Sequence, residues 1–169
     1  LHHLTVRQLR QEVNGNFLAA GTNAIYASTS VENLEDYYNA HAVLLSKMGH
    51  VIWHHIYGGS ASDDCNYSTA TSDGNAVLVG HVASGDGDNP DNYGFKCWMW
   101  KIDVAHNGNI IWQTYFGTPG DSAALFNVVE TNDGGFIGVG AIGPDDNPPY
   151  ETWDAYAGKV DENGNLLWT

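Results

Sequence analysis

One unit recurs through this chain with a period of just under 60 residues. Such a repeat restricts the fold to architectures assembled from copies of one supersecondary unit. The first marker is a tryptophan that ends a short apolar run after a glycine turn. These tryptophans, 59 and 56 residues apart, are Trp53, Trp112 and Trp168. The second marker is a glycine turn that opens an apolar run. Its glycines, 59 and 60 residues apart, are Gly15, Gly74 and Gly134.

Each unit is predicted to contain four short strands, most clearly in the third copy. Residues 125–131 alternate apolar and polar side chains, as a half-buried strand does. The Asp133-Gly134 pair that follows is a strong hairpin signal, because both residue types accept positive φ. Residues 136–142 form a continuous apolar run, which indicates a strand covered on both faces. A third strand at 154–161, a further Asn-Gly turn and a short fourth strand complete the unit.

Four antiparallel strands in a unit of 56–60 residues are typical of a β-propeller blade. The sequence therefore predicts an all-β, β-propeller-like fold, with residues 1–169 forming a single domain or segment. Its three four-stranded antiparallel blades are expected at about 4–57, 64–116 and 123–169. Residues 4–13 resemble a helix in isolation, but they align with the first strand of the other units. A β-sandwich or a solenoid is the alternative architecture.

The repeated tryptophan has a structural role in this reading. The fourth strand of a blade lies at the outer edge, where a large flat side chain can cover the neighbouring blade. Burial of such an aromatic contributes about 2–3 kcal/mol by area. All three tryptophans are therefore expected to be largely buried at equivalent positions.

Residues 101–112 and 159–168 resemble the Asp-turn-Gly-x-x-Trp segment of tryptophan-docked propellers of the quinoprotein type. Together with residues 57–59 and 131–140, they are similar to blade repeats of large secreted bacterial surface proteins. The resemblance covers nearly the whole chain and implies the propeller fold. The first unit departs from it, because residues 45–53 lack the Asp. No organic cofactor is carried over, because no ligand set of the quinoprotein pocket matches.

The charge balance excludes two classes of partner. The chain has 20 acidic and 6 basic residues and a formal net charge of −14. Such a surface repels nucleic-acid phosphates and anionic lipid headgroups. No apolar run is long enough to span a bilayer. The sequence lacks an initiator Met and is interpreted as a mature or excised segment of an extracellular or cell-surface protein.

Long acidic loops between the second and third strands of each unit are expected on one rim of the molecule. The second of these loops offers three closely spaced carboxylates for Ca²⁺ in a flexible segment, namely Asp86, Asp88 and Asp91. The alternative is a solvated acidic loop. Adjacent pairs such as Asp63-Asp64 point to opposite sides of an extended chain, so no catalytic carboxylate pair is predicted.

Aromatic residues in or beside the same loops suggest a surface for glycan or protein binding. They include Trp98, Trp100 and Trp153, together with Tyr37, Tyr38, Tyr93 and Tyr150. Core packing explains Trp98 and Trp100 equally well, because their spacing places both on one strand face. Asn66 begins a glycosylation acceptor triplet. The pairs His2-His3 and His54-His55 lack metal-ligand spacing and are expected to be structural or exposed.

The two cysteines, Cys65 and Cys97, occur only in the second unit, on its first and third strands. Those strands lie about 9–10 Å apart, beyond ordinary disulfide reach. Both residues nevertheless lie at the same end of the predicted sheet, and an extracellular setting favours pairing. The sequence interpretation leans towards a Cys65–Cys97 disulfide.

These features favour a non-catalytic extracellular scaffold or interaction module within a larger ring or a polymeric filament. Its partners would be other copies of the chain or further blades of a longer chain, with a protein or glycan ligand as an addition. A glycan-binding lectin that uses the acidic-aromatic rim is the alternative. A propeller enzyme or quinoprotein fragment has less support, since the sequence holds no G-x-S-x-G, phosphate-loop or dinucleotide motif.

Overall fold

The computed structural model describes residues 3–12, 14–26, 36–83, 94–144 and 153–169. These residues form three four-stranded antiparallel sheets, as the sequence predicts. The first sheet contains β1 (His3–Gln11), β2 (Phe17–Tyr26), β3 (Asp36–Leu45) and β4 (Val51–Tyr57). The second contains β5 (Asp63–Ala70), β6 (Ala76–Val82), β7 (Lys96–Asp103) and β8 (Asn109–Phe116). The third contains β9 (Asp121–Glu130), β10 (Phe136–Pro144), β11 (Asp154–Val160) and β12 (Leu166–Trp168).

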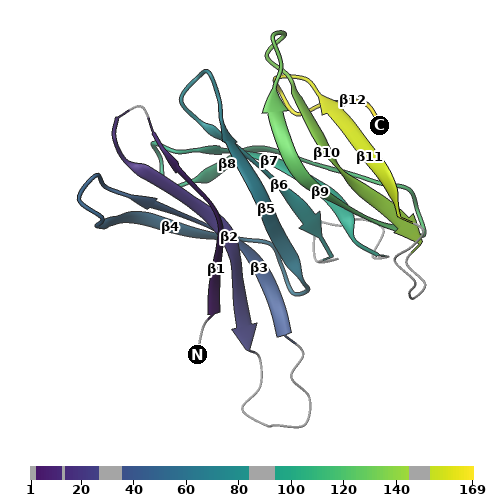
Figure 1. Ribbon diagram of the computed structural model, residues 1–169, viewed down its shortest axis with the longest axis horizontal. Helices are drawn as coiled ribbons and strands as arrows, with labels where there is room; N and C mark the ends of the chain where they lie inside the picture. The colour runs from purple at the N-terminus through teal and green to yellow at the C-terminus, as the bar shows by residue number, and fades with distance from the viewer. Residues whose placement is uncertain (1–2, 13, 27–35, 84–93, 145–152) are drawn as a thin grey trace.

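In every sheet the strands lie side by side in chain order, so that β4, β8 and β12 are edge strands. Figure 1 shows the three sheets following one another across the molecule, with the second between the other two. This arrangement is consistent with propeller-like blades. Residues 4–11 of the helix-like segment belong to β1, as their alignment predicts. None of the described residues belongs to a helix long and apolar enough to cross a membrane.

Each sheet carries the same β-bulge between its first two strands. The extra residue on the first strand is, in turn, Arg7, Asn66 and Phe126. The glycines opposite these bulges are Gly21, Gly80 and Gly140. A Cβ at any of the three would overlap the backbone carbonyl of the first strand. Only glycine allows this close backbone approach, so the bulge accounts for a glycine in every copy.

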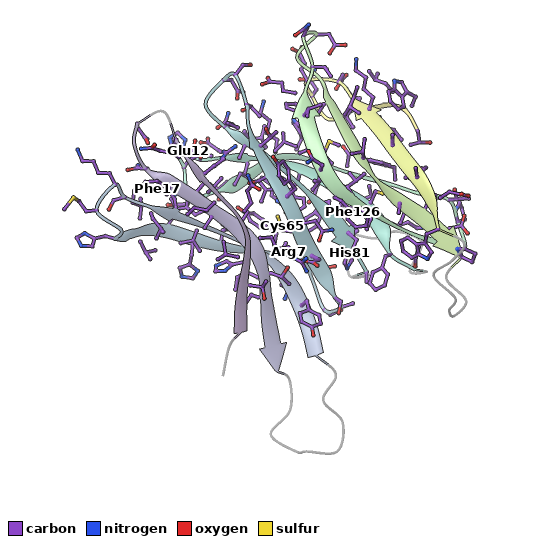
Figure 2. All side chains as sticks on the ribbon, viewed as in Figure 1. Arg7, Glu12, Phe17, Cys65, His81 and Phe126 are labelled. Carbon is purple, nitrogen blue, oxygen red and sulfur yellow. The ribbon has the colours of Figure 1, made fainter. Side chains whose placement is uncertain are left out.

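Two apolar cores lie between the sheets, and the middle sheet contributes to both. Trp98 and Trp100 pack towards the first sheet, whereas Cys97 and Met99 pack towards the third. Successive side chains of a strand point to opposite faces, and β7 is accordingly buried from residue 96 through 102. Figure 2 shows side chains filling the spaces between the three sheets.

Candidate functional site: the sheet junctions

The last turn of each sheet presents a glycine on a fixed backbone. In the turn between β11 and β12, Asp161 Oδ1 accepts hydrogen bonds from the N–H groups of Asn163 (2.9 Å) and Asn165 (2.8 Å). A further bond from the Asn165 side chain, with these backbone bonds, lowers the pKa of Asp161. Gly164 has φ 81°, which favours glycine. These hydrogen bonds hold the turn in one conformation, and its glycine presents a surface without a side chain.

A tryptophan of the preceding sheet lies on this bare glycine at both junctions. Trp53 Nε1 donates to the Val104 carbonyl at 3.0 Å, and its ring covers Gly108. Trp112 Nε1 donates to the Glu162 carbonyl at 3.1 Å, and its ring covers Gly164. A Cβ at Gly108 would come within 2.8 Å of the Trp53 ring.

Val104 and Glu162 each follow the Asp that begins their turn, so the two bonds are equivalent. The repeated tryptophan and the repeated glycine turn are thus the two halves of one contact.

A second hydrogen bond at each junction ends on the carbonyl of the turn glycine. The Tyr57 hydroxyl donates to the Gly108 carbonyl at 2.7 Å. The Thr114 hydroxyl donates to the Gly164 carbonyl. Burial raises the pKa of Tyr57, so the hydroxyl keeps the proton that it donates.

The bulge residues of β1 and β5, the first strands of the first and second sheets, reach the following sheet. Arg7 forms an ion pair with Asp64 at 3.0 Å, and Asn66 Nδ2 donates to the Leu125 carbonyl at 2.9 Å. A glycan would be attached to this same Asn66 nitrogen. Glycosylation of Asn66 stays a prediction. The third bulge residue, Phe126, is 53% exposed.

The first sheet has the same final turn although it lacks the Asp. Ser46 Oγ accepts hydrogen bonds from the N–H groups of Met48 (3.3 Å) and His50 (3.1 Å), as Asp161 does in the third sheet. Gly49 has φ 83°, is exposed and would place a Cβ more than 4 Å from any other group. The departure seen in the sequence therefore changes the side chain that stabilises the turn and leaves its shape intact.

The expectation that all three tryptophans are largely buried is wrong for the third. Trp53 is 7% exposed and Trp112 is partly buried, whereas Trp168 is 46% exposed. All three occupy equivalent positions, opposite Leu44, Lys101 and Lys159 of the third strand. The rings of Trp53 and Trp112 are covered by the final turn of the following sheet, and no described residue covers Trp168 in that way.

Two of the aromatic residues considered for the acidic-aromatic rim do not lie on the surface. Trp98 and Trp100 are fully buried and stack on each other, with ring centroids 3.8 Å apart. Tyr38 is 41% exposed and Trp153 is half-buried. Tyr93 and Tyr150 lie outside the described residues, and of Tyr37 only the strand position is described.

The proposed calcium ligands Asp86, Asp88 and Asp91 also lie outside the described residues, so this site stays a prediction. Among the side chains that the structure does describe, no group of three or more His, Cys, Asp or Glu could hold a metal ion.

Adjacent polar pairs point apart, as predicted. Asp63 accepts hydrogen bonds from the backbone N–H groups of Gly59 (2.7 Å) and Ala83 (3.0 Å), whereas Asp64 binds Arg7. His54 meets His41 edge to face, whereas His55 stacks on Tyr57 with centroids 4.6 Å apart.

The expected disulfide is absent, because Cys65 and Cys97 are both free and buried. Cys65 pairs across the strands with Gly80, whereas Cys97 pairs with the next residue, His81. Consecutive positions of β6 face opposite sides, and the thiols accordingly belong to different cores. The structure does not support the Cys65–Cys97 disulfide.

Thiol labelling tests this correction. Burial raises the pKa of Cys97 to about 12 and that of Cys65 further, so little reactive thiolate forms at neutral pH. In the folded protein, neither cysteine is expected to react with an alkylating reagent. In denaturant without reductant, two thiols are expected to react. Labelling of no thiol in denaturant would establish the disulfide instead.

Sequence reasoning missed the bulges and the role of Ser46. A signal for the bulges is present, because Gly21, Gly80 and Gly140 each follow a repeated turn glycine by six residues. Neither a comparison with protein-family models nor a search of curated proteins returns a match to this chain.

Proposed function

We propose that this chain is a non-catalytic β-propeller segment of the tryptophan-docked kind, which serves as an extracellular scaffold within a larger ring or filament. The observation that carries the proposal is the repeated junction, in which Trp53 and Trp112 make the same contact with the following sheet. A contact that joins successive sheets in one way can be extended by further sheets without new chemistry. The chain is thus a building unit of an assembly.

Equivalent positions differ in burial between the middle and the ends of the row of sheets. Leu125 and Cys65 are fully buried against a preceding sheet, whereas the equivalent Val6 is 52% exposed. Val79 is fully buried against a following sheet, whereas the equivalent Val139 is 47% exposed. The apolar run at 136–142 was expected to be covered on both faces, but the structure covers only one. Apolar patches of this kind mark interaction surfaces.

The polar groups described above also favour a scaffold. Asp63, Asp64 and Asn66 hold turns, strands and junctions in place. The lectin alternative has weaker support, because Trp98 and Trp100 belong to the core rather than to an exposed rim. An extracellular setting remains part of the proposal and rests on the resemblance to secreted surface repeats.

The proposal predicts that the chain does not persist as a free monomer. Light scattering across a range of concentrations is expected to give a molar mass that rises above the 18.3 kDa of one chain. The unfolding midpoint is expected to rise with concentration, because association stabilises the folded state by mass action. A monodisperse monomer whose unfolding is independent of concentration would contradict the proposal.

A further inference from the structure

The two outer sheets carry the complementary halves of one more junction. In the described part of the chain, nothing covers Trp168 of the third sheet or the glycine turn at residues 46–50 of the first sheet. We infer that Trp168 of one chain docks on the 46–50 turn of a second copy of this chain, head to tail. This inference rests on the proposed scaffold function and names its partner.

Trp168 is placed as the two docked tryptophans are. It pairs with Lys159 next to a one-residue irregularity of the strand pairing, and Trp112 and Trp53 pair in the same way next to the same irregularity. The indole of each docked tryptophan donates to a backbone carbonyl just after the third strand of the next sheet. The acceptors are Val104, one residue after β7 ends, at 3.0 Å, and Glu162, two residues after β11 ends, at 3.1 Å. Trp168 has the same donor on an exposed ring, at the edge strand that Figure 1 shows beside the C-terminus.

The 46–50 turn has the same backbone hydrogen-bond pattern as the 161–165 turn of the third sheet, on which Trp112 docks. A turn that receives a tryptophan in this way is called a socket here. The Ser46 N–H donates to the His50 carbonyl at 2.8 Å, and the Gly49 N–H donates to the Ser46 carbonyl at 2.8 Å. The corresponding bonds of the occupied socket measure 2.9 Å from Asp161 to Asn165 and 3.1 Å from Gly164 to Asp161. The Lys47 carbonyl therefore corresponds to the Glu162 carbonyl, and it is the predicted acceptor for the Trp168 indole.

The first strands of the two outer sheets, β9 and β1, also carry side chains that match the contact made between the second and third sheets. Asn66, at the bulge of the second sheet, reaches the Leu125 carbonyl of the third. Phe126 is the equivalent bulge residue, and Val6 is the equivalent of Leu125 in the first sheet. In the inferred junction Phe126 therefore meets Val6, and both are apolar and more than half exposed. Leu9, 60% exposed on the same face of the first sheet, corresponds to the buried Val128.

The charge distribution favours contact between unlike ends. Residues 121–169 contain nine Asp or Glu and one Lys, whereas residues 1–60 contain four Asp or Glu, three Lys or Arg and six of the eight His. Contact between two third sheets would place the most acidic parts of two copies together. Contact between a third and a first sheet avoids this repulsion. Because such a contact joins different surfaces, it can close into a ring or continue as a filament.

Two substitutions test the two halves separately. Trp168→Ala removes the docking ring, and Gly49→Asn covers the socket with a residue type that tolerates positive φ. A buried interface tryptophan typically contributes enough that either change is expected to weaken self-association by about 10- to 100-fold. Matched controls are Leu167→Ala, an exposed neighbour on β12, and Gly74→Asn, at a turn with φ 84° and no group within 4 Å of a Cβ. Both controls are expected to associate as the parent chain does.

Mixing the two defective variants identifies the polarity of the contact. The Gly49→Asn chain keeps Trp168 and the Trp168→Ala chain keeps the open turn, so the mixture contains one working pair. Sedimentation is expected to show complexes of two chains that grow no further. If the parent associates and both variants associate equally well, the inferred junction is wrong although the scaffold proposal stands. If the parent stays monomeric at every concentration, the scaffold proposal fails with it.

Discussion

Replacing Trp53 by alanine is expected to lower the free energy of unfolding by about 3–5 kcal/mol, the usual range for a buried tryptophan. Its ring is 7% exposed, covers Gly108 and donates to the Val104 carbonyl, so its loss opens a cavity and leaves an acceptor unpaired. Trp112→Ala is expected to cost less, because Trp112 is only partly buried. Trp168→Ala in dissociated chains is expected to change stability by no more than about 0.5 kcal/mol.

Chemical denaturation monitored by circular dichroism measures the series, at concentrations low enough that light scattering shows single chains. The graded order matters more than any one value, because the three residues are equivalent in sequence and differ in what covers them. Equal losses at all three positions would contradict the junction as described. A large loss at Trp168 in single chains would show that residues outside the described part cover it.

The repeat was sufficient to predict the three sheets, because strand alternation and the hairpin glycines recur in each unit. It could not predict the burial of Trp168. Burial of a docked tryptophan depends on the turn of another sheet, and the sequence around Trp168 is the same whether or not that turn is present. The equivalence of Trp53, Trp112 and Trp168 was therefore predictable, and their different exposure was not.

The cysteines illustrate a second limit, which concerns register. Cys65 and Cys97 pair with consecutive residues of β6, and this offset of one residue places them on opposite faces of the sheet. A one-residue shift in register reverses the face of every side chain. The bulge at Asn66 moves the register of β5 at that place, and a bulge leaves only a weak trace in the sequence. The disulfide prediction was wrong because the bulge places the two thiols on opposite faces of the sheet.

Ser46 illustrates a third limit. The sequence pattern was defined by an Asp, so its absence from the first unit was interpreted as a departure from the repeat. The turn needs an oxygen that accepts two backbone N–H groups, and a serine hydroxyl supplies one as an aspartate does. The chemical function of the position is retained although the residue type changes.

Replacing Trp100 by alanine is expected to cost about 3–5 kcal/mol, as a second large loss of stability. Trp100 is fully buried between the first and second sheets and stacks on Trp98 with centroids 3.8 Å apart. Tyr57 also contacts it, at 5.9 Å between centroids, so a cavity here would loosen the junction that Tyr57 helps to form. Denaturation curves of the variant should show the loss, with unchanged circular dichroism of the folded state.

Phenylalanine variants separate packing from hydrogen bonding at the two tryptophans. The Trp100 indole N–H is buried and has no hydrogen-bond partner among the described residues, whereas that of Trp53 donates to Val104. Trp100→Phe removes an unpaired donor, whose burial costs about 1–3 kcal/mol, and this gain offsets part of the lost packing. Trp53→Phe loses packing and also leaves the Val104 carbonyl unpaired. Trp100→Phe is therefore expected to be the milder change although Trp100 is the more buried residue. The opposite order would mean that packing alone decides the stability of this core.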